Sequence, residues 1–189
     1  MDIKYIIKIQ AIIRGYLIRK NILNNPLVLS WILCREYFLN IHQHKEKLWG
    51  NTIINKYLYH KFTNQWTSVL GEYIVYNLLK NKGYNVYKPK KKNGYKPDLE
   101  SDDYVYEIKT RCYSVKGTAG EKILGTPYKY ADVPKLYNKP LIIILVGYQE
   151  YEGKHIFKLF DDDISDERKM ILTLYKTIGI TYKCASDLL

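Results

Sequence analysis

The stretch that most limits how this chain can fold is an unbroken apolar run that follows Pro140 directly. Its six residues are Leu141, Ile142, Ile143, Ile144, Leu145 and Val146. A strand with one face in water alternates apolar and polar residues, so an uninterrupted run rich in β-branched residues indicates a strand buried on both faces. Strands of this kind lie in sheets that carry helices on both sides. We therefore expect an α/β fold in which residues 141–146 form a central strand.

The segments around this run alternate between helical and extended patterns. A helix is expected over residues 64–81, closed by Gly83, because its apolar residues recur at helical spacing. The remaining expected elements are strands at 84–87, 96–100, 104–112 and 178–183, and helices at 127–136 and 164–177. Strands that alternate with helices favour one α/β core over residues 62–189.

The first third of the chain has a different pattern, typical of helices alone. An amphipathic basic helix is expected over residues 2–24, ended by Pro26, and two more over 27–48 and 52–62, with Gly50 between them. A chain of 189 residues suffices for one core with an extension. We therefore expect a helical region over residues 1–61 that could make dimer or DNA contacts, joined to the core.

The formal net charge of +11 attracts polyanions, most commonly nucleic acid or an anionic membrane surface, and nucleic acid is the leading partner. Basic residues gather at the front, with ten Lys or Arg against three acidic residues in 1–61 and six against eight in 149–189. A Lys-rich coding bias is the alternative explanation.

Composition also limits where the protein works. Cys34, Cys112 and Cys184 form no CxxC pair, which argues against disulfides and a zinc site. No apolar run is long enough to cross a membrane, and the N-terminus lacks a signal-peptide pattern. We expect a soluble intracellular protein of the cytoplasm or nucleoid, and composition alone suggests a viral or bacterial source.

The constellation that carries chemistry lies between the two halves of an expected hairpin. Asp98 precedes Glu107 by nine positions, and Lys109 follows two residues later. Side chains alternate along a strand, so Glu107 and Lys109 share one face while Ile108 points to the other. If the neighbouring strand places Asp98 beside Glu107, both carboxylates and the Ile108 carbonyl offer the oxygen ligands that Mg²⁺ prefers.

Such a site suits the hydrolysis of a phosphodiester bond. A bound divalent cation lowers the pKa of an attacking water and offsets charge in the transition state. Lys109 would position that water or the scissile phosphate, as a base or as an electrostatic stabiliser. Considered by itself, a Glu-x-Lys triplet on a strand is more often a solvated cross-strand charge pair.

Pro97 and Asp98, followed by Glu107, Ile108 and Lys109, resemble the motif of the PD-(D/E)XK superfamily of restriction-endonuclease-like nucleases. The resemblance covers residues 64–183 and implies a mixed central sheet flanked by helices. In that superfamily a helix before the core supplies another Glu, which is matched here by Glu72 as a metal or water ligand. A carboxylate on the wet face of the helix is the alternative for Glu72.

Two segments are candidates for DNA contact. The first is a cationic loop interleaved with tyrosines, which carries Lys88, Lys90, Lys91, Lys92 and Lys96. The second, residues 116–130, is similar to a region that approaches DNA in short type II restriction enzymes. Its glycines permit close backbone approach, and its candidate phosphate contacts are Lys116, Thr118, Lys122 and Lys129. Solvated loop lysines remain the alternative for both segments.

A second motif lies in the first expected helix, where residues 9–20 look like an IQ motif. An apolar stripe flanked by basic residues suits the acidic, Met-lined groove of a calmodulin-like EF-hand partner. The same stripe also suits packing on the protein's own core.

These expectations together favour a Mg²⁺-dependent type II restriction endonuclease that cuts double-stranded DNA. A homodimer is expected because two-fold symmetry is the simplest way to cut both strands of a palindrome. A structure-directed nuclease, such as a junction resolvase or repair enzyme, is one alternative. A DNA-binding or calmodulin-binding module that does not cut is another.

Overall fold

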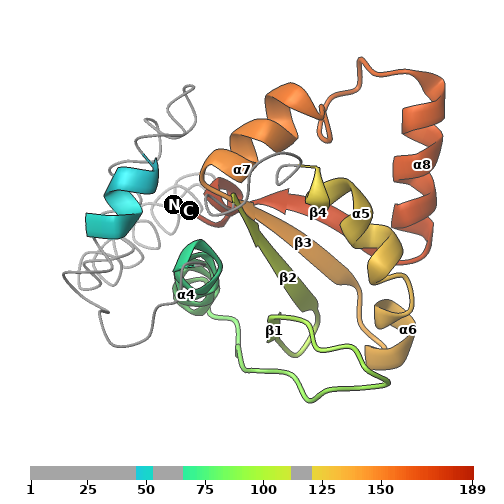
Figure 1. The fold of residues 1–189 in the computed structure, drawn as a ribbon. Helices are drawn as coiled ribbons and strands as arrows, with labels where there is room; N and C mark the ends of the chain where they lie inside the picture. Colours follow the sequence, from blue (N-terminus) through green and yellow to red (C-terminus); the bar gives the residue numbers. More distant parts are fainter. Residues whose placement is uncertain (1–45, 53–65, 112–120) are drawn as a thin grey trace, which may run out of the picture.

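The computed structural model describes residues 46–52, 66–111 and 121–189, and its core is a four-stranded sheet (Figure 1). The strands lie in the order β1 (Leu99–Glu100), β2 (Val105–Thr110), β3 (Leu141–Val146) and β4 (Ile180–Cys184). Strand β1 pairs antiparallel with β2, whereas β2, β3 and β4 are parallel. This mixed sheet with flanking helices confirms the expected α/β class.

Strand β3 lies inside the sheet and contributes to the core on both faces. Ile143 pairs with Glu107 of β2 on one side and with Tyr182 of β4 on the other. Its alternate side chains Leu141, Ile143 and Leu145 belong to one buried cluster, and Ile144 and Val146 belong to the other. The apolar run is therefore central and buried on both faces, as expected.

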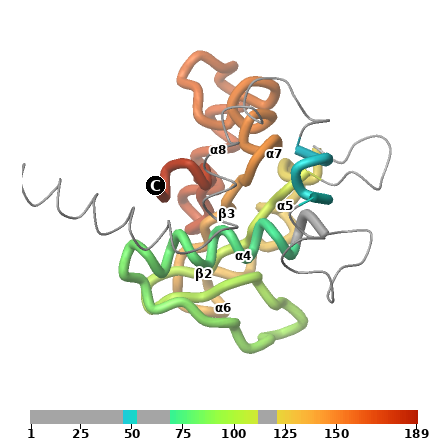
Figure 2. Tube along the Cα trace, turned by 90° about the vertical axis from the view of Figure 1, so that its left-hand side faces the viewer, coloured from blue at the N-terminus to red at the C-terminus, as the bar shows by residue number. Residues whose placement is uncertain are grey.

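Helix α4 (Trp66–Asn81) covers one face of the sheet and runs alongside β2 (Figure 2). Its side chains Leu70, Ile74 and Leu78 are buried in the cluster that also contains Ile144 and Val146. Gly71 allows the close approach, because a Cβ atom there would collide with the methyl group of Thr110 on β2. The neighbouring residue, Glu72, is thereby held near the hairpin of β1 and β2.

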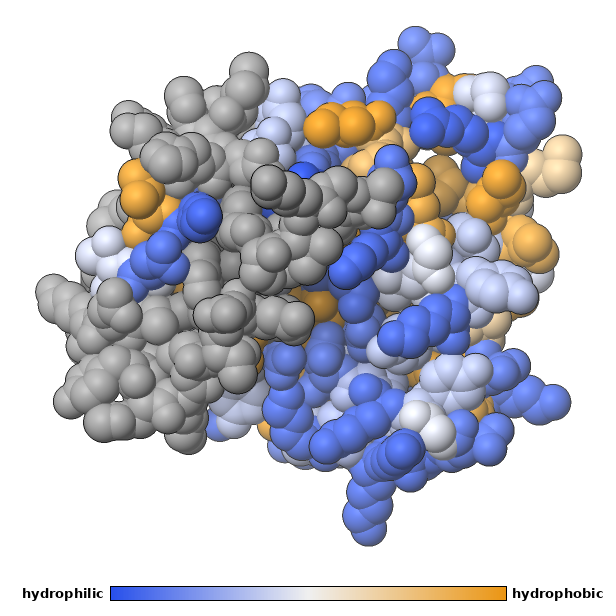
Figure 3. Space-filling view, in the orientation of Figure 1, coloured by the Kyte–Doolittle hydropathy of each residue, from blue (hydrophilic) through white to orange (hydrophobic). Residues whose placement is uncertain are grey.

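The opposite face is covered by α5 (Lys122–Lys129), α6 (Val133–Tyr137) and α8 (Asp166–Thr177) (Figure 1). Ile123 and Val133 are completely buried against the sheet. Ser165 begins α8 by accepting a hydrogen bond from the backbone N–H of Arg168. No residue of α8 is buried, and hydrophobic side chains gather over this helix on the surface (Figure 3).

A polar layer closes the carboxyl end of β3. Gly147, with a φ of +63°, leads into α7 (Tyr148–Tyr151), which continues as a π-helical turn over Glu152–Ile156. A Cβ atom at Gly147 would collide with the carboxylate of Glu46, which accepts a hydrogen bond from the N–H of Tyr148 at 3.2 Å. The helical turn at 46–52 is thus attached to this end of the sheet. A last 3-10 turn spans Ala185–Leu188.

Three local expectations differ from the structure. Residues 84–87 form no strand, and only Tyr87 makes a bridge, to Glu100. The helix expected at 127–136 is two helices, because α5 begins before Pro127 and ends at Lys129, and α6 begins at Val133. Residues 46–52 are helical through Gly50, so this glycine does not separate two helices.

The expected helices over residues 2–24 and the expected boundary at residues 61–62 lie outside the described residues. Within the described ranges, no helix is both long and apolar enough to span a membrane.

Candidate active site

The hairpin formed by β1 and β2 places Asp98 beside Glu107. The backbone N–H of Asp98 donates to the carbonyl of Tyr106 at 3.0 Å, which extends the antiparallel pairing by one residue. The backbone N–H of Ile108 in turn donates to Asp98 Oδ2 at 2.7 Å. The condition set by the sequence, that a neighbouring strand bring the two carboxylates together, is met.

The side chains of Glu107, Ile108 and Lys109 alternate between the two faces of the sheet along β2, as expected. Ile108 is buried in the cluster under α4, whereas Glu107 and Lys109 face the side of α5 and α6. Lys109 Nζ lies 2.5 Å from Glu107 Oε1. Glu107 is only 4% exposed, so this ion pair lies largely out of water.

Burial and crowding of carboxylates change the protonation of Asp98. Burial is the largest cause that raises the pKa of Asp98, to about 7, and the negative charges of Glu107 and then Glu72 add to it. The Ile108 N–H and the Lys109 ammonium oppose this rise in pKa. The carboxylates therefore form a site where additional positive charge is favoured.

Glu72 approaches the same site from α4. Lys88 Nζ lies 2.5 Å from Glu72 Oε2 and 3.0 Å from the backbone carbonyl oxygen of Asp98. Lys88 thus joins helix α4 to the start of the hairpin. The carboxylate of Glu72 is close enough to affect Asp98, but in this structure it is held by a lysine.

Tyr130, at the end of α5, covers the Glu107–Lys109 pair. Its side chain is 7% exposed, and its ring centroid lies 6.0 Å from Lys109 Nζ. Burial, then the charge of Glu107, and then a hydrogen-bonding interaction with the Glu107 carboxylate raise the pKa of the Tyr130 hydroxyl, so it stays protonated beside that carboxylate. The sequence predicts no role for Tyr130 itself, although this residue lies within the segment 116–130 that is expected to contact DNA.

The donors at this site fit a hard divalent cation. Glu107 Oε2 is buried, and no hydrogen bond of acceptable geometry reaches it within the described residues. A buried carboxylate oxygen in that state is costly unless something pairs with it. Glu107, Asp98 and the Ile108 carbonyl are the oxygen ligands that Mg²⁺ accepts, with water completing its shell. The described residues contain no group of three or more His, Cys, Asp or Glu side chains placed to hold a metal.

The candidate DNA-binding lysines are mostly free at the surface. Lys90, Lys91, Lys96 and Lys122 are exposed, on a face that is largely hydrophilic around the 88–96 loop (Figure 3). Lys92 instead donates to the Leu136 carbonyl at 3.3 Å and lies over the Tyr137 ring. Lys129 lies over the Tyr130 ring, 5.0 Å from its centroid. Lys116 and Thr118 lie outside the described residues.

Arg111, directly after β2, continues the alternation of charged residues, and the sequence predicts no role for it. Its Nη1 lies 2.5 Å from Glu152 Oε1, and Glu152 Oε2 accepts from Gln149 Nε2 at 2.9 Å. The alternation of Glu107, Lys109 and Arg111 in the sequence indicates on which face the Arg111 side chain lies. The sequence contains no comparable signal that Glu152, 41 residues away, is its partner. This buried pair fixes the end of β2 beyond Lys109.

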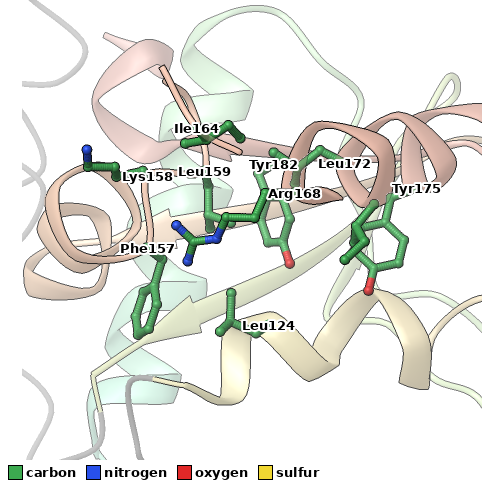
Figure 4. A pocket seen from close by; sticks show the side chains of 10 residues that line it. Leu124, Phe157, Lys158, Leu159, Ile164, Arg168, Leu172, Tyr175 and Tyr182 are labelled. Atoms are coloured by element: carbon green, nitrogen blue, oxygen red, sulfur yellow. The ribbon is translucent and has the colours of Figure 1, made fainter. Parts of the chain in front are cut away.

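A cavity of about 120 Å³ lies away from these carboxylates, between α8, α5 and β4 (Figure 4). Its lining is mainly apolar and includes Leu124, Leu172, Tyr175 and Tyr182, with Lys158 and Arg168 at its side. None of the candidate catalytic residues lines it, so the chemistry that we assign to the hairpin does not involve this cavity.

Comparison with known proteins gives one finding. Residues 3–23 match the family model described as the IQ calmodulin-binding motif, which supports the IQ-like interpretation of the N-terminal segment. No curated protein and no solved structure matches the chain.

Proposed function

We propose that this protein is a Mg²⁺-dependent endodeoxyribonuclease of the PD-(D/E)XK type, with Asp98, Glu107 and Lys109 as its catalytic centre. The observation that carries the proposal is the state of Glu107. Its carboxylate is buried, pairs with Lys109 through one oxygen and leaves the other with no hydrogen bond of acceptable geometry within the described residues, beside the Tyr130 hydroxyl and the carboxylate of Asp98. That combination destabilises the folded protein when nothing pairs with the carboxylates, and it suits a bound cation.

Each residue has a role in this proposal. Asp98 and Glu107 bind the cation, and Ile108 contributes its carbonyl oxygen. Bound Mg²⁺ would lower the pKa of an attacking water and offset charge on the reacting phosphate. Lys109, held against Glu107 and the Tyr130 ring, would orient that water or the phosphate. Glu72 is proposed as a further ligand, direct or through water.

The arrangement of the core supports the resemblance on which the proposal draws. Helix α4 precedes an antiparallel hairpin, and the strand that carries Glu107 and Lys109 then pairs in parallel with a buried strand. Asp98 and Glu107 meet at that hairpin, which the motif alone does not guarantee. This arrangement agrees with a restriction-endonuclease-like core.

Double-stranded DNA is the proposed substrate, and the protein is proposed to act as a homodimer. The net charge of +11 and the exposed lysines of the 88–96 loop suit a phosphate backbone. Cleavage of both strands at a palindrome is most simply achieved by two centres related by a two-fold axis.

The test is to incubate the full-length protein with unmethylated phage DNA, in Mg²⁺ or in EDTA, beside Asp98→Ala and Lys109→Ala variants. Discrete fragments that require Mg²⁺ and both side chains would support a sequence-specific restriction endonuclease. A Mg²⁺-dependent smear, or cleavage of branched DNA alone, would favour a nonspecific or structure-directed nuclease. Intact DNA on all substrates would contradict the proposal and leave a binding module.

A second function is supported by the match of residues 3–23 to the IQ motif. We propose that this segment binds a calmodulin-like EF-hand protein, because its basic, apolar sequence suits an acidic hydrophobic groove. Immobilised calmodulin should retain the full-length protein and lose it when Ile13 and Arg14 are both changed to Glu. Equal recovery of the two proteins, with or without Ca²⁺, would contradict this function.

A further inference from the structure

Two ammonium groups already occupy the acidic site. Lys109 pairs with Glu107 at 2.5 Å, and Lys88 pairs with Glu72 at the same distance while donating to the backbone carbonyl of Asp98 at 3.0 Å. Two of the three carboxylates around the site are thus neutralised by lysines that the chain itself provides.

The backbone places Lys88 at this position. Tyr87, the preceding residue, exchanges two backbone hydrogen bonds of 2.9 Å with Glu100 on β1. Pro89, which follows, is buried. The backbone of Lys88 is therefore fixed at the edge of the hairpin, and only its side chain can change partners.

The two lysines differ in how easily they can leave. The Lys109 side chain is 24% exposed and lies under the Tyr130 ring, whereas the Lys88 side chain is 60% exposed. An exposed ion pair is weak, because water screens it and the long side chain loses freedom when it is held. Lys88 is therefore the one that another cation can displace.

We propose that Lys88 is a displaceable counterion of the candidate metal site. In the metal-free protein it neutralises Glu72 and ties it to Asp98, and it opposes the arrival of a divalent cation by charge repulsion. Binding of the cation releases the Lys88 ammonium, which then becomes available to a DNA phosphate. The inference rests on the proposed metal site, and it does not require that the protein cut DNA.

Isothermal titration of Mg²⁺ and of Mn²⁺ into the full-length protein without DNA tests this role. Lys88→Met should bind either cation about two- to fivefold more tightly than wild type, the range expected when an exposed competing ion pair is removed. Lys88→Arg keeps the charge and should bind as wild type does. Lys91→Met is the matched control, since it removes the same charge from the same loop at an exposed residue with no assigned contact to the carboxylates.

Each outcome decides between the two proposals. Equal affinities for Lys88→Met and Lys91→Met, or weaker binding by Lys88→Met, would overturn the counterion role even if the wild type cuts DNA. Tighter cation binding by Lys88→Met alone, with DNA left intact by the wild type, would support the counterion role and contradict the proposed nuclease activity. If no variant and no wild-type protein binds either cation, both proposals fail.

Discussion

The fold and the proposed chemistry favour different protonation states of Asp98. The hairpin buries its carboxylate beside Glu107, and this raises its pKa to about 7. Coordination of a cation requires the ionised form. A bound divalent cation reverses the balance, because its charge offsets the repulsion between the two carboxylates. The unfavourable burial of Asp98 in the metal-free protein is therefore a cost that a bound cation would offset.

This cost predicts a pH dependence of stability. Between the ordinary pKa of 3.8 and the raised value of about 7, the folded protein holds a proton that the unfolded chain has lost. The free energy of unfolding should therefore fall as pH rises through this window, and Asp98→Asn should remove that part of the fall. Urea unfolding in EDTA at intervals from pH 4.5 to about 7.5 measures it.

The quantity to compare is the free energy of unfolding of Asp98→Asn minus that of the wild type. This difference should increase as pH rises. Asp103→Asn, at an exposed carboxylate of the same hairpin, should show no such trend. A difference for Asp98→Asn that stays constant across the range would contradict the proposed environment.

The sequence predicted which candidate side chains lie together where a strand sets their neighbours. Alternation places Glu107 with Lys109 and buries Ile108, and a hairpin then brings Asp98 alongside. Contacts between distant elements could not be predicted in this way. The pairing of Lys88 with Glu72 depends on how α4 lies over the hairpin, and the position of Tyr130 depends on where α5 ends.

At the scale of elements, the approach of α4 to β2 decides where Glu72 lies. Gly71 packs against the methyl group of Thr110 with no space for a Cβ atom. Thr110 is β-branched, so its side chain has little freedom to move aside. The helix would have to shift away from the sheet to admit any larger residue.

Gly71→Ala should therefore destabilise the protein by about 1–3 kcal/mol, as overpacking generally does. This effect exceeds the gain of roughly 1 kcal/mol that alanine otherwise brings to a helix. Adding Thr110→Ser, which deletes the methyl group, should recover most of the loss. Thermal or urea unfolding of the single and double variants measures both effects.

Gly125→Ala in α5 is the matched control, because a Cβ atom there meets nothing within 4 Å. It should leave stability unchanged or raise it by about 0.5–1 kcal/mol. Equal effects of alanine at the two glycines would show that the contact between α4 and β2 is not close.

The elements themselves were predictable to different degrees. The run at 141–146 identified β3 and its central place, because only burial on both faces tolerates so many consecutive apolar residues. The segment at 122–137 was less clear, since Pro127 suggests a helix start but lies inside α5. The buried polar turn after β3 was missed, because Gln149, Glu150 and Glu152 have the composition of a surface segment.

At the scale of the whole molecule, the chain combines an acidic, lysine-lined site with a basic exterior. The overall charge of +11 attracts a polyanion, whereas the buried carboxylates repel one unless a cation lies between them. Under the proposed function, binding and chemistry should thus depend differently on Mg²⁺: association with DNA should need the lysines alone, whereas hydrolysis should need the metal.

The segment that matches the IQ motif would give the chain a separate means of association under the second proposed function. It lies in the most basic third of the chain, while the candidate catalytic residues are all in the core. Loss of calmodulin retention on mutation of the segment, with no change in Mg²⁺ affinity, would show that the two parts act independently.

The most direct test of the central claim is the rate at which purified Glu107→Gln protein cleaves DNA that the wild type cuts. Gln keeps the size of the side chain and removes the charge that would hold the cation. We predict that wild type cuts in Mg²⁺ and not in EDTA, that Asp103→Asn cuts at the wild-type rate, and that Glu107→Gln, folded as judged by circular dichroism, is slower by about 10²-fold or more. Cleavage by Glu107→Gln at the wild-type rate, or wild-type cleavage that persists in EDTA, would contradict the account.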